Sequence, residues 1–148
     1  MKVPAIPPSD TFRFRTRVRS RWADEDTQGV VNHATYLALI EEARHEYFGA
    51  LGQVADNRFP FVIMQINARY LASSRGGEEV SVELRTMELG KSSMRQACRI
   101  RAAGDDRVLV EAEVLLVSWS LEGDRKVDLS PGMREALTRF EGGFEPAG

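Results

Sequence analysis

The chain has 148 residues, a formal net charge of −2 and a hydrophobic fraction of 43%. This length suits one domain, and a chain of about 150 residues buries enough surface to fold without disulfides or metals. Almost balanced charge argues against a nucleic-acid binder, because such proteins present positive charge to phosphates. The longest apolar runs fall well short of the roughly 18 residues that a membrane span needs.

Cysteine and histidine are scarce. A single cysteine, Cys98, excludes an internal disulfide or a thiolate metal cluster and suits a reducing compartment, and two histidines argue against a histidine-based metal site. The proline-containing start of the chain lacks the apolar core of a signal peptide. We therefore expect a cytoplasmic protein with no metal and no membrane span.

The first predicted element is a strand that follows a Pro-rich lead-in at residues 1–11. Apolar or small side chains alternate with five arginines from Phe12 to Trp22, which is the period of a half-buried strand. The arginine row suggests either a polyanion site or a solvated outer sheet face. We favour the solvated face, because antiparallel sheets commonly expose one face to water.

A long helix is predicted next. From Ala34 to Phe48 apolar residues recur at helical spacing, with charged residues on the other side. Asn32 is a suitable N-cap, and Gly49 and Gly52 mark the end.

The rest of the sequence is mostly strand-like, with predicted strands at 61–71, 80–85, 94–101 and 108–121. A short helix is predicted over Pro131–Glu141, capped by Ser130, and residues 142–148 are expected to be a flexible tail. Residues 12–141 then form one domain, with an α+β fold and an antiparallel sheet. The last strand places apolar residues on the sheet face opposite the helix, which we interpret as a subunit interface: Leu109, Leu115, Val117, Trp119 and Leu121.

Three acidic residues before the helix are the strongest candidates for chemistry. Asp24, Glu25 and Asp26 lie beside the unpaired N–H groups of a helix start. They form either a solvated loop that the helix dipole stabilises, or a nucleophile or base next to an oxyanion site. Gly29 allows a tight turn and close approach to a ligand. His33 could join the carboxylate in acid–base chemistry, although a lone histidine is more often structural.

Signatures of other enzyme classes are missing from the sequence, including the nucleophile elbow, the dinucleotide-binding glycines, the P-loop and the zinc-protease motif. Cys98 lies among apolar residues in a strand and is interpreted as a core residue. Lys91, Ser92 and Ser93 form a hairpin turn whose charge and hydroxyls could also hold a phosphate.

The segment from Arg21 to Tyr36, continued by Glu41-Glu42-Ala43-Arg44, resembles a known signature. It is similar to the D-x-D-x-x-G-[hydrophobic]-V-x-[HYN]-x-x-Y…E-E-A-R pattern of hotdog-fold acyl-CoA thioesterases of the 4-hydroxybenzoyl-CoA thioesterase type, which include small thioesterases associated with the Tol–Pal system. Asn67–Leu71 and Gly90–Ser93 extend the resemblance over most of the chain. It implies a long helix wrapped by a five-stranded antiparallel sheet, with homodimers and homotetramers.

The resemblance also implies the site. The catalytic carboxylate falls on Asp26, as nucleophile or general base, with backbone N–H groups near His33 and Ala34 as oxyanion donors and His33 in a supporting role. Asp24 is implied to be structural and paired with an arginine. No cofactor is implied, since coenzyme A is part of the substrate. The expected substrate-binding residues are Gly29, Asn32, Tyr36, Gln65, Asn67, Lys91, Ser92 and Ser93.

Several alternatives stay open. Tyr36 is equally compatible with the core, and Gln65 and Asn67 with buried polar positions in the sheet. Asn32 stands where Tol–Pal-associated members have an aromatic residue, and Lys91 is alone where some members have several basic residues. The expected function is hydrolysis of a small to medium acyl- or aryl-CoA. The alternatives are a catalytically weak hotdog protein that binds an acyl ligand or serves as an assembly subunit, and a hotdog dehydratase.

Overall fold

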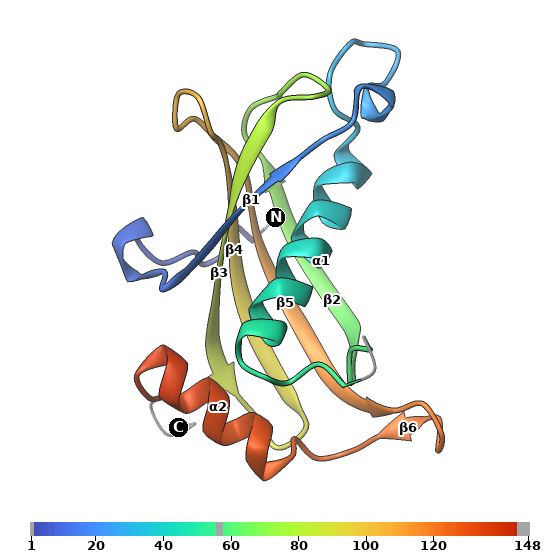
Figure 1. Cartoon of the computed structure of the whole chain (residues 1–148), viewed down its shortest axis with the longest axis vertical. Coiled ribbons are helices and arrows are strands. Elements are labelled where there is room, and N and C mark those ends of the chain that lie inside the picture. Colours follow the sequence, from blue (N-terminus) through green and yellow to red (C-terminus); the bar gives the residue numbers. More distant parts are fainter. Residues whose placement is uncertain (1, 56–57, 145–148) are drawn as a thin grey trace.

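The computed structural model describes residues 2–55 and 58–144. Within these residues, five long strands form one antiparallel sheet in the order β1-β3-β4-β5-β2, and a long helix, α1 (His33–Ala50), lies across one face (Figure 1). This arrangement confirms the predicted α+β fold. The strands are β1 (Phe14–Arg19), β2 (Phe61–Tyr70), β3 (Glu79–Leu89), β4 (Ser93–Ala102), β5 (Val108–Ser120) and a two-residue addition to β5, β6 (Arg125–Lys126).

Helix α1 begins at the predicted cap. The Ala34 N–H donates to Asn32 Oδ1 at 2.8 Å, which satisfies one of the free N–H groups of the first turn. The helix runs two residues beyond the predicted end, because Gly49 remains helical. Gly52 follows with a φ of 70°, a left-handed conformation that suits glycine at a helix end.

The core lies between α1 and the inner face of the sheet. Buried residues of α1 such as Ile40 and Phe48 join buried residues of β3, β4 and β5, Cys98 among them. The second helix, α2 (Pro131–Glu141), has the predicted bounds, and Ser130 Oγ accepts the Met133 N–H as its cap. It lies at the end of the sheet where β3 turns into β4 (Figure 1). No helix among the described residues is long and apolar enough to cross a membrane.

The first strand is shorter than predicted. It ends at Arg19, and residues Trp22–Asp24 form a 3-10 turn, η2, because the Asp24 carboxylate caps the Arg21 N–H and turns the chain. Trp22, predicted to share the buried side of the strand, is instead 80% exposed. The arginines of β1 lie on a solvated face, as predicted, and pair with glutamates of β3 such as Glu79.

The outer face of the sheet differs from the predicted apolar surface. Leu109 belongs to the core cluster instead. Cross-strand ion pairs occupy much of the outer face, and Glu83 at its centre is fully buried. Three arginines surround that carboxylate: Arg15 at 2.9 Å, Arg101 at 3.1 Å and Arg99 at 3.6 Å. Charged and apolar side chains therefore share the outer face, and its role as a subunit interface stays a prediction.

The Pro-rich lead-in crosses this outer face, and we call residues 2–12 the N-terminal strap. It contacts three neighbouring strands: the Lys2 C=O accepts from Asn67 on β2 at 3.2 Å, the Ala5 N–H donates to Glu113 on β5, and the Pro7 C=O accepts from Arg99 on β4 at 3.2 Å. The Arg99 guanidinium also stacks over the Phe12 ring, 5.5 Å from its centroid. Proline restricts the backbone and favours such an extended path. A short 3-10 turn, η1 (Ser9–Thr11), then leads toward β1.

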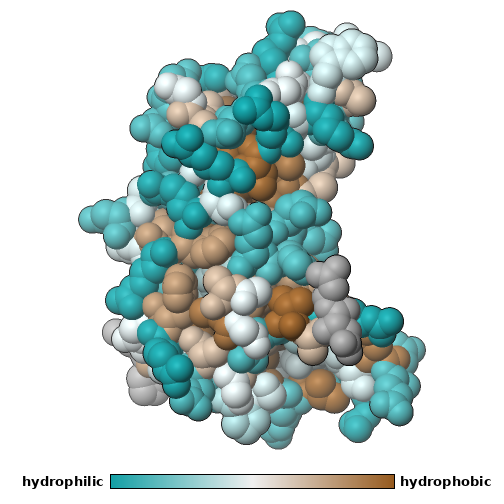
Figure 2. Space-filling view, in the orientation of Figure 1, coloured by the Kyte–Doolittle hydropathy of each residue, from teal (hydrophilic) through white to brown (hydrophobic). Residues whose placement is uncertain are grey.

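Strand β2 lies at one edge of the sheet. Among the described strands it pairs with β5 alone, and it carries the exposed apolar side chains of Ile63, Met64 and Ile66. Figure 2 shows apolar side chains reaching the surface in patches between hydrophilic ones. A ten-residue edge strand of this kind is a ready surface for pairing with another chain.

Candidate functional site

The acidic loop before α1 is folded back on itself. A β-bridge joins Glu25 to Val31, and the Asp26 N–H donates to the Val30 C=O at 2.9 Å. Gly29 closes the turn with a φ of 77°, which residues with a side chain rarely adopt. The Asn32 N–H also donates to the Asp24 C=O at 2.9 Å, so the start of this loop is tied to the cap of α1.

A second loop anchors the acidic loop from behind. The Val31 N–H donates to the Ser74 C=O at 2.9 Å, and the Ser74 hydroxyl lies 2.7 Å from the Tyr36 hydroxyl. Gly76 packs so closely that a Cβ there would lie 2.7 Å from the Arg21 carbonyl oxygen. Tyr36 is buried in the core, and its hydroxyl bonds to Ser74, so we interpret it as a structural residue and not as a substrate contact.

Two of the three acidic residues hold the loop together. Asp24 pairs with Arg21 at 2.8 Å, and hydrogen bonds from the Arg21 side chain and backbone lower the pKa of Asp24. Glu25 accepts the Gly76 N–H at 2.9 Å and lies 3.5 Å from the Arg75 guanidinium. Both carboxylates are therefore already engaged in the native fold.

Asp26 differs from its two neighbours. Its carboxylate accepts one hydrogen bond, from the Gln28 N–H at 2.8 Å, and it forms no ion pair with any described residue. The side chain is half-buried. A carboxylate with oxygen atoms still free to accept a proton or attack a carbonyl is the one suited to catalysis.

The first turn of α1, which follows the acidic loop, has backbone donors of its own. The Ala34 N–H is occupied by Asn32 Oδ1, and the Thr35 N–H donates to the Asn32 C=O at 3.0 Å. The His33 N–H has no acceptor among the described residues. His33 therefore supplies the open donor, whereas Ala34 becomes available only when the Asn32 carboxamide gives way.

Tyr70, at the end of β2, is a residue of this site that the sequence reasoning missed. Its hydroxyl donates to the His33 C=O at 3.2 Å, and its ring lies almost perpendicular to the imidazole, with centroids 6.1 Å apart. Burial, and then the nearby Tyr36, raise the pKa of Tyr70. The motif at Asn67–Leu71 contained this tyrosine, but a strand pattern does not reveal which helix end lies beside it.

The comparisons with known proteins show the family of the chain. A family model described as the thioesterase-like superfamily matches residues 20–137, a range that includes the acidic loop and α1. The chain belongs to this superfamily. It is 33% identical over 113 residues to the acyl-CoA thioester hydrolase YbgC of Escherichia coli O6:H1, and the match covers 73% of this chain and 83% of the relative.

Solved structures place this thioesterase in the hotdog fold. A thioesterase of Thermus thermophilus, complexed with coenzyme A and Zn, superposes with a TM-score of 0.78 at 33% identity, covering 90% of this chain and 98% of that one. The 1,4-dihydroxy-2-naphthoyl-CoA thioesterase Slr0204 of Synechocystis has a TM-score of 0.75 at 19% identity, covering 84% and 94%, and supports the fold alone. The protein is a thioester hydrolase.

Other expected substrate-binding residues of the thioesterase lie away from Asp26. Gln65 and Asn67 pair with Leu115 and Glu113 on the outer face of the sheet, opposite α1. Gln65 is exposed and Asn67 bonds to the N-terminal strap, so neither is a polar residue buried within the sheet. Within one chain they do not reach the acidic loop.

Lys91, Ser92 and Ser93 are also distant from the acidic loop, because the turn between β3 and β4 lies at the opposite end of the sheet (Figure 1). Lys91 Nζ is 4.0 Å from Asp128, and the Ser92 hydroxyl is 3.2 Å from the same carboxylate. Lys91 is nonetheless exposed and able to meet a phosphate.

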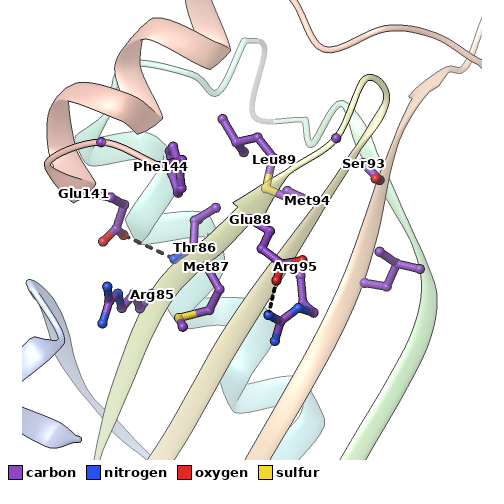
Figure 3. Close-up of a pocket in the computed structure, with 13 residues that line it drawn as sticks. Arg85, Thr86, Met87, Glu88, Leu89, Ser93, Met94, Arg95, Glu141 and Phe144 are labelled. Atoms are coloured by element: carbon purple, nitrogen blue, oxygen red, sulfur yellow. Dashed lines mark hydrogen bonds and ion pairs between the residues drawn. The ribbon is translucent and has the colours of Figure 1, made fainter. Parts of the chain in front are cut away.

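A pocket of about 650 Å³ opens beside this turn, under the end of α2 (Figure 3). Ser93 and Glu141 line it, and the Glu141 carboxylate accepts the Thr86 N–H at 3.2 Å. It is separate from the acidic loop. Among the described residues no cluster of histidine, cysteine and acidic side chains could hold a metal.

Proposed function

We propose that this thioesterase hydrolyses acyl-CoA thioesters, with Asp26 as nucleophile or general base and the His33 N–H as an oxyanion donor. One observation carries the proposal: Asp26 is the acidic residue of the loop without a cationic partner among the described residues, and the Asn32 N–H···Asp24 O=C bond ties this loop to the cap of α1. The E. coli relative is named an acyl-CoA thioester hydrolase and the Thermus relative binds coenzyme A, which supports the substrate class.

The reaction needs few groups, because a thioester is a reactive electrophile. As a general base, Asp26 takes a proton from the water that attacks the carbonyl carbon; as a nucleophile, it forms an anhydride that water then hydrolyses. Either way the carbonyl oxygen becomes an oxyanion, which the positive end of α1 stabilises. The C–S bond then breaks and the thiolate leaves with a proton, for which the exposed imidazole of His33 is the nearest assigned donor.

We further propose that the site is completed by a second copy of the chain. Ser93, Val117 and Val62 form one row across β4, β5 and β2, at the end of the sheet opposite Tyr70. If two β2 strands pair antiparallel about a twofold axis, the Tyr70 end of one strand meets the Val62 end of the other. The turn at Lys91 of the second copy then approaches the acidic loop of the first.

The decisive experiment measures thiol release from short, medium, long and aromatic acyl-CoAs by the wild type and by Asp26→Asn. The amide cannot act as base or nucleophile, so we expect kcat to fall by about 100-fold or more on the best substrate. Asp10→Asn, an exposed change in the N-terminal strap, is the matched control. A baseline without substrate corrects for reaction of Cys98 with the thiol reagent.

Two outcomes would contradict the proposal. Near-normal turnover by Asp26→Asn excludes the role of that carboxylate. If the folded wild type hydrolyses no acyl-CoA, yet acyl-CoA raises its melting temperature, the protein is an acyl-binding member of the family.

A further inference from the structure

On the basis of the function proposed above, we infer that Tyr70 is a positioning residue: its hydroxyl orients the peptide group between His33 and Ala34, whose N–H then stabilises the oxyanion. The inference assigns a role to a side chain on β2, outside both the acidic loop and α1. It also explains how a donor that is occupied in the free protein can serve the reaction.

The first step is a continuous line of hydrogen bonds through one peptide group. The Tyr70 hydroxyl donates to the His33 C=O at 3.2 Å, and the N–H of the same peptide group, that of Ala34, donates to Asn32 Oδ1 at 2.8 Å. A peptide group is planar, so a contact that holds its C=O also sets the direction of its N–H. Because linked hydrogen bonds polarise one another, the Tyr70 hydroxyl also makes this N–H a stronger donor.

The Ala34 N–H can exchange one acceptor for another. In the free protein a neutral carboxamide, that of Asn32, occupies the Ala34 N–H. An oxyanion is a stronger acceptor than an amide oxygen, because a hydrogen bond to a charged group is roughly twice as strong as a neutral one. The developing oxyanion can therefore displace Asn32 Oδ1 and use the Ala34 N–H together with the open His33 N–H. Tyr70 keeps the peptide group in place during this exchange.

Tyr70 is itself held by strand pairing and by two neighbouring rings. Tyr70 pairs with Val110 at the end of β2, and its ring contacts the rings of His33, at 6.1 Å, and Tyr36, at 6.2 Å between centroids. Tyr36 is in turn held by the Ser74 hydroxyl. The phenol therefore ties the start of α1 to the sheet, which is the arrangement that a preorganised oxyanion site requires.

The test compares Tyr70→Phe, which removes only the hydroxyl, with Leu71→Ala at the next, exposed position. On the best acyl-CoA we expect Tyr70→Phe to lower kcat by about tenfold, as expected for one lost hydrogen bond, with KM changed less than about twofold. Leu71→Ala should keep the wild-type values, and both variants should melt within a few degrees of the wild type.

A spectroscopic measurement separates positioning from a merely structural role. The same substrate, labelled with ¹³C at its carbonyl, is bound to Asp26→Asn with and without Tyr70→Phe, and its C=O stretch is recorded in the infrared. Oxyanion donors lower this frequency, so we expect the Tyr70→Phe change to move it back toward the value in water.

The results for Tyr70 and for Asp26 test different claims. An unchanged kcat, or a lower kcat with an unchanged C=O stretch, overturns the role of Tyr70. Normal turnover by Asp26→Asn rejects the proposed function instead, and this result is recorded before any Tyr70 variant is made.

Discussion

Glu141 and Asp26 are both carboxylates close to a helix end, but their surroundings give them different chemistry. Asp26 accepts one backbone N–H and stays half-exposed. Glu141 is only 7% exposed; its Oε1 accepts the Tyr47 hydroxyl at 2.8 Å and the Thr86 N–H, while its Oε2 has no hydrogen-bond partner among the described residues. Burial raises the pKa of Glu141, and burial together with this carboxylate raises the pKa of Tyr47.

This difference predicts a pH-dependent stability. Because the pKa of Glu141 is higher in the folded state, folding is favoured while the group is protonated, and that contribution is lost as the pH rises through the folded pKa. We expect Glu141→Gln to remove the loss of stability that the wild type shows as the pH rises above the ordinary glutamate pKa, since the amide keeps the Oε1 contacts without a charge. Urea unfolding across that range measures it. Glu135→Gln, exposed on the same helix, is the control, and equal pH slopes for Glu141→Gln and the wild type would contradict the prediction.

The N-terminal strap covers ion pairs on the outer face of the sheet. It covers Arg99, which links Glu83 to Glu111 across three strands. Charges under such a cover are screened by salt much less than charges in water. The strap therefore shields the ion pairs of Arg99 from water, and it lies on the same sheet face as the apolar residues predicted to form a subunit interface.

Deleting residues 2–9 tests this role of the strap. The deletion exposes Arg99 and Glu113 to water, so we expect a lower midpoint of urea unfolding, and a midpoint that depends more strongly on salt than that of the wild type. The measurement is made at low and high sodium chloride with Pro8→Ala, an exposed single change, beside it. A midpoint and a salt dependence like those of the wild type would show that the strap contributes nothing to this network.

In the whole molecule, the residues expected to form one site lie at two opposite ends of the sheet. The acidic loop and the start of α1 lie at one end, and the turn between β3 and β4 lies at the other (Figure 1). In the dimer proposed above, pairing of two β2 edges would bring one end of the first copy beside the opposite end of the second. The expected homotetramer stays a prediction, and an assembly through the outer faces would have to displace the N-terminal strap.

Charges placed on the β2 edge test the shared site. We expect the double variant Ile63→Glu and Met64→Glu to lower the mass measured by light scattering to that of one chain, because like charges facing each other oppose strand pairing. Turnover should fall with it, since Lys91 no longer reaches the acidic loop of a second copy. Leu121→Glu, on an exposed apolar residue of another turn, should change neither property. A single chain with full turnover would show that the site is complete without a partner.

Features that depend on neighbours along the chain could be predicted from the amino-acid sequence. Alternation predicted the strands, helical spacing predicted α1 and α2, and the caps Asn32 and Ser130 were recognisable because an N-cap bonds to a residue two or three positions away. The acidic motif before α1 likewise predicted the family, because its residues are contiguous.

Which of these residues contact one another depends on packing between segments that are far apart in the chain. The contact that engages Glu25, with Gly76, spans 51 positions, and the one that joins Tyr70 to His33 spans 37, so no local period reveals either. The sheet twists and pairs its strands out of sequence order, which carried Gln65 and Asn67 to the outer face and Lys91 to the far end. The physical reason is that alternation defines two faces of a strand, whereas only packing against the rest of the molecule decides which face is inside.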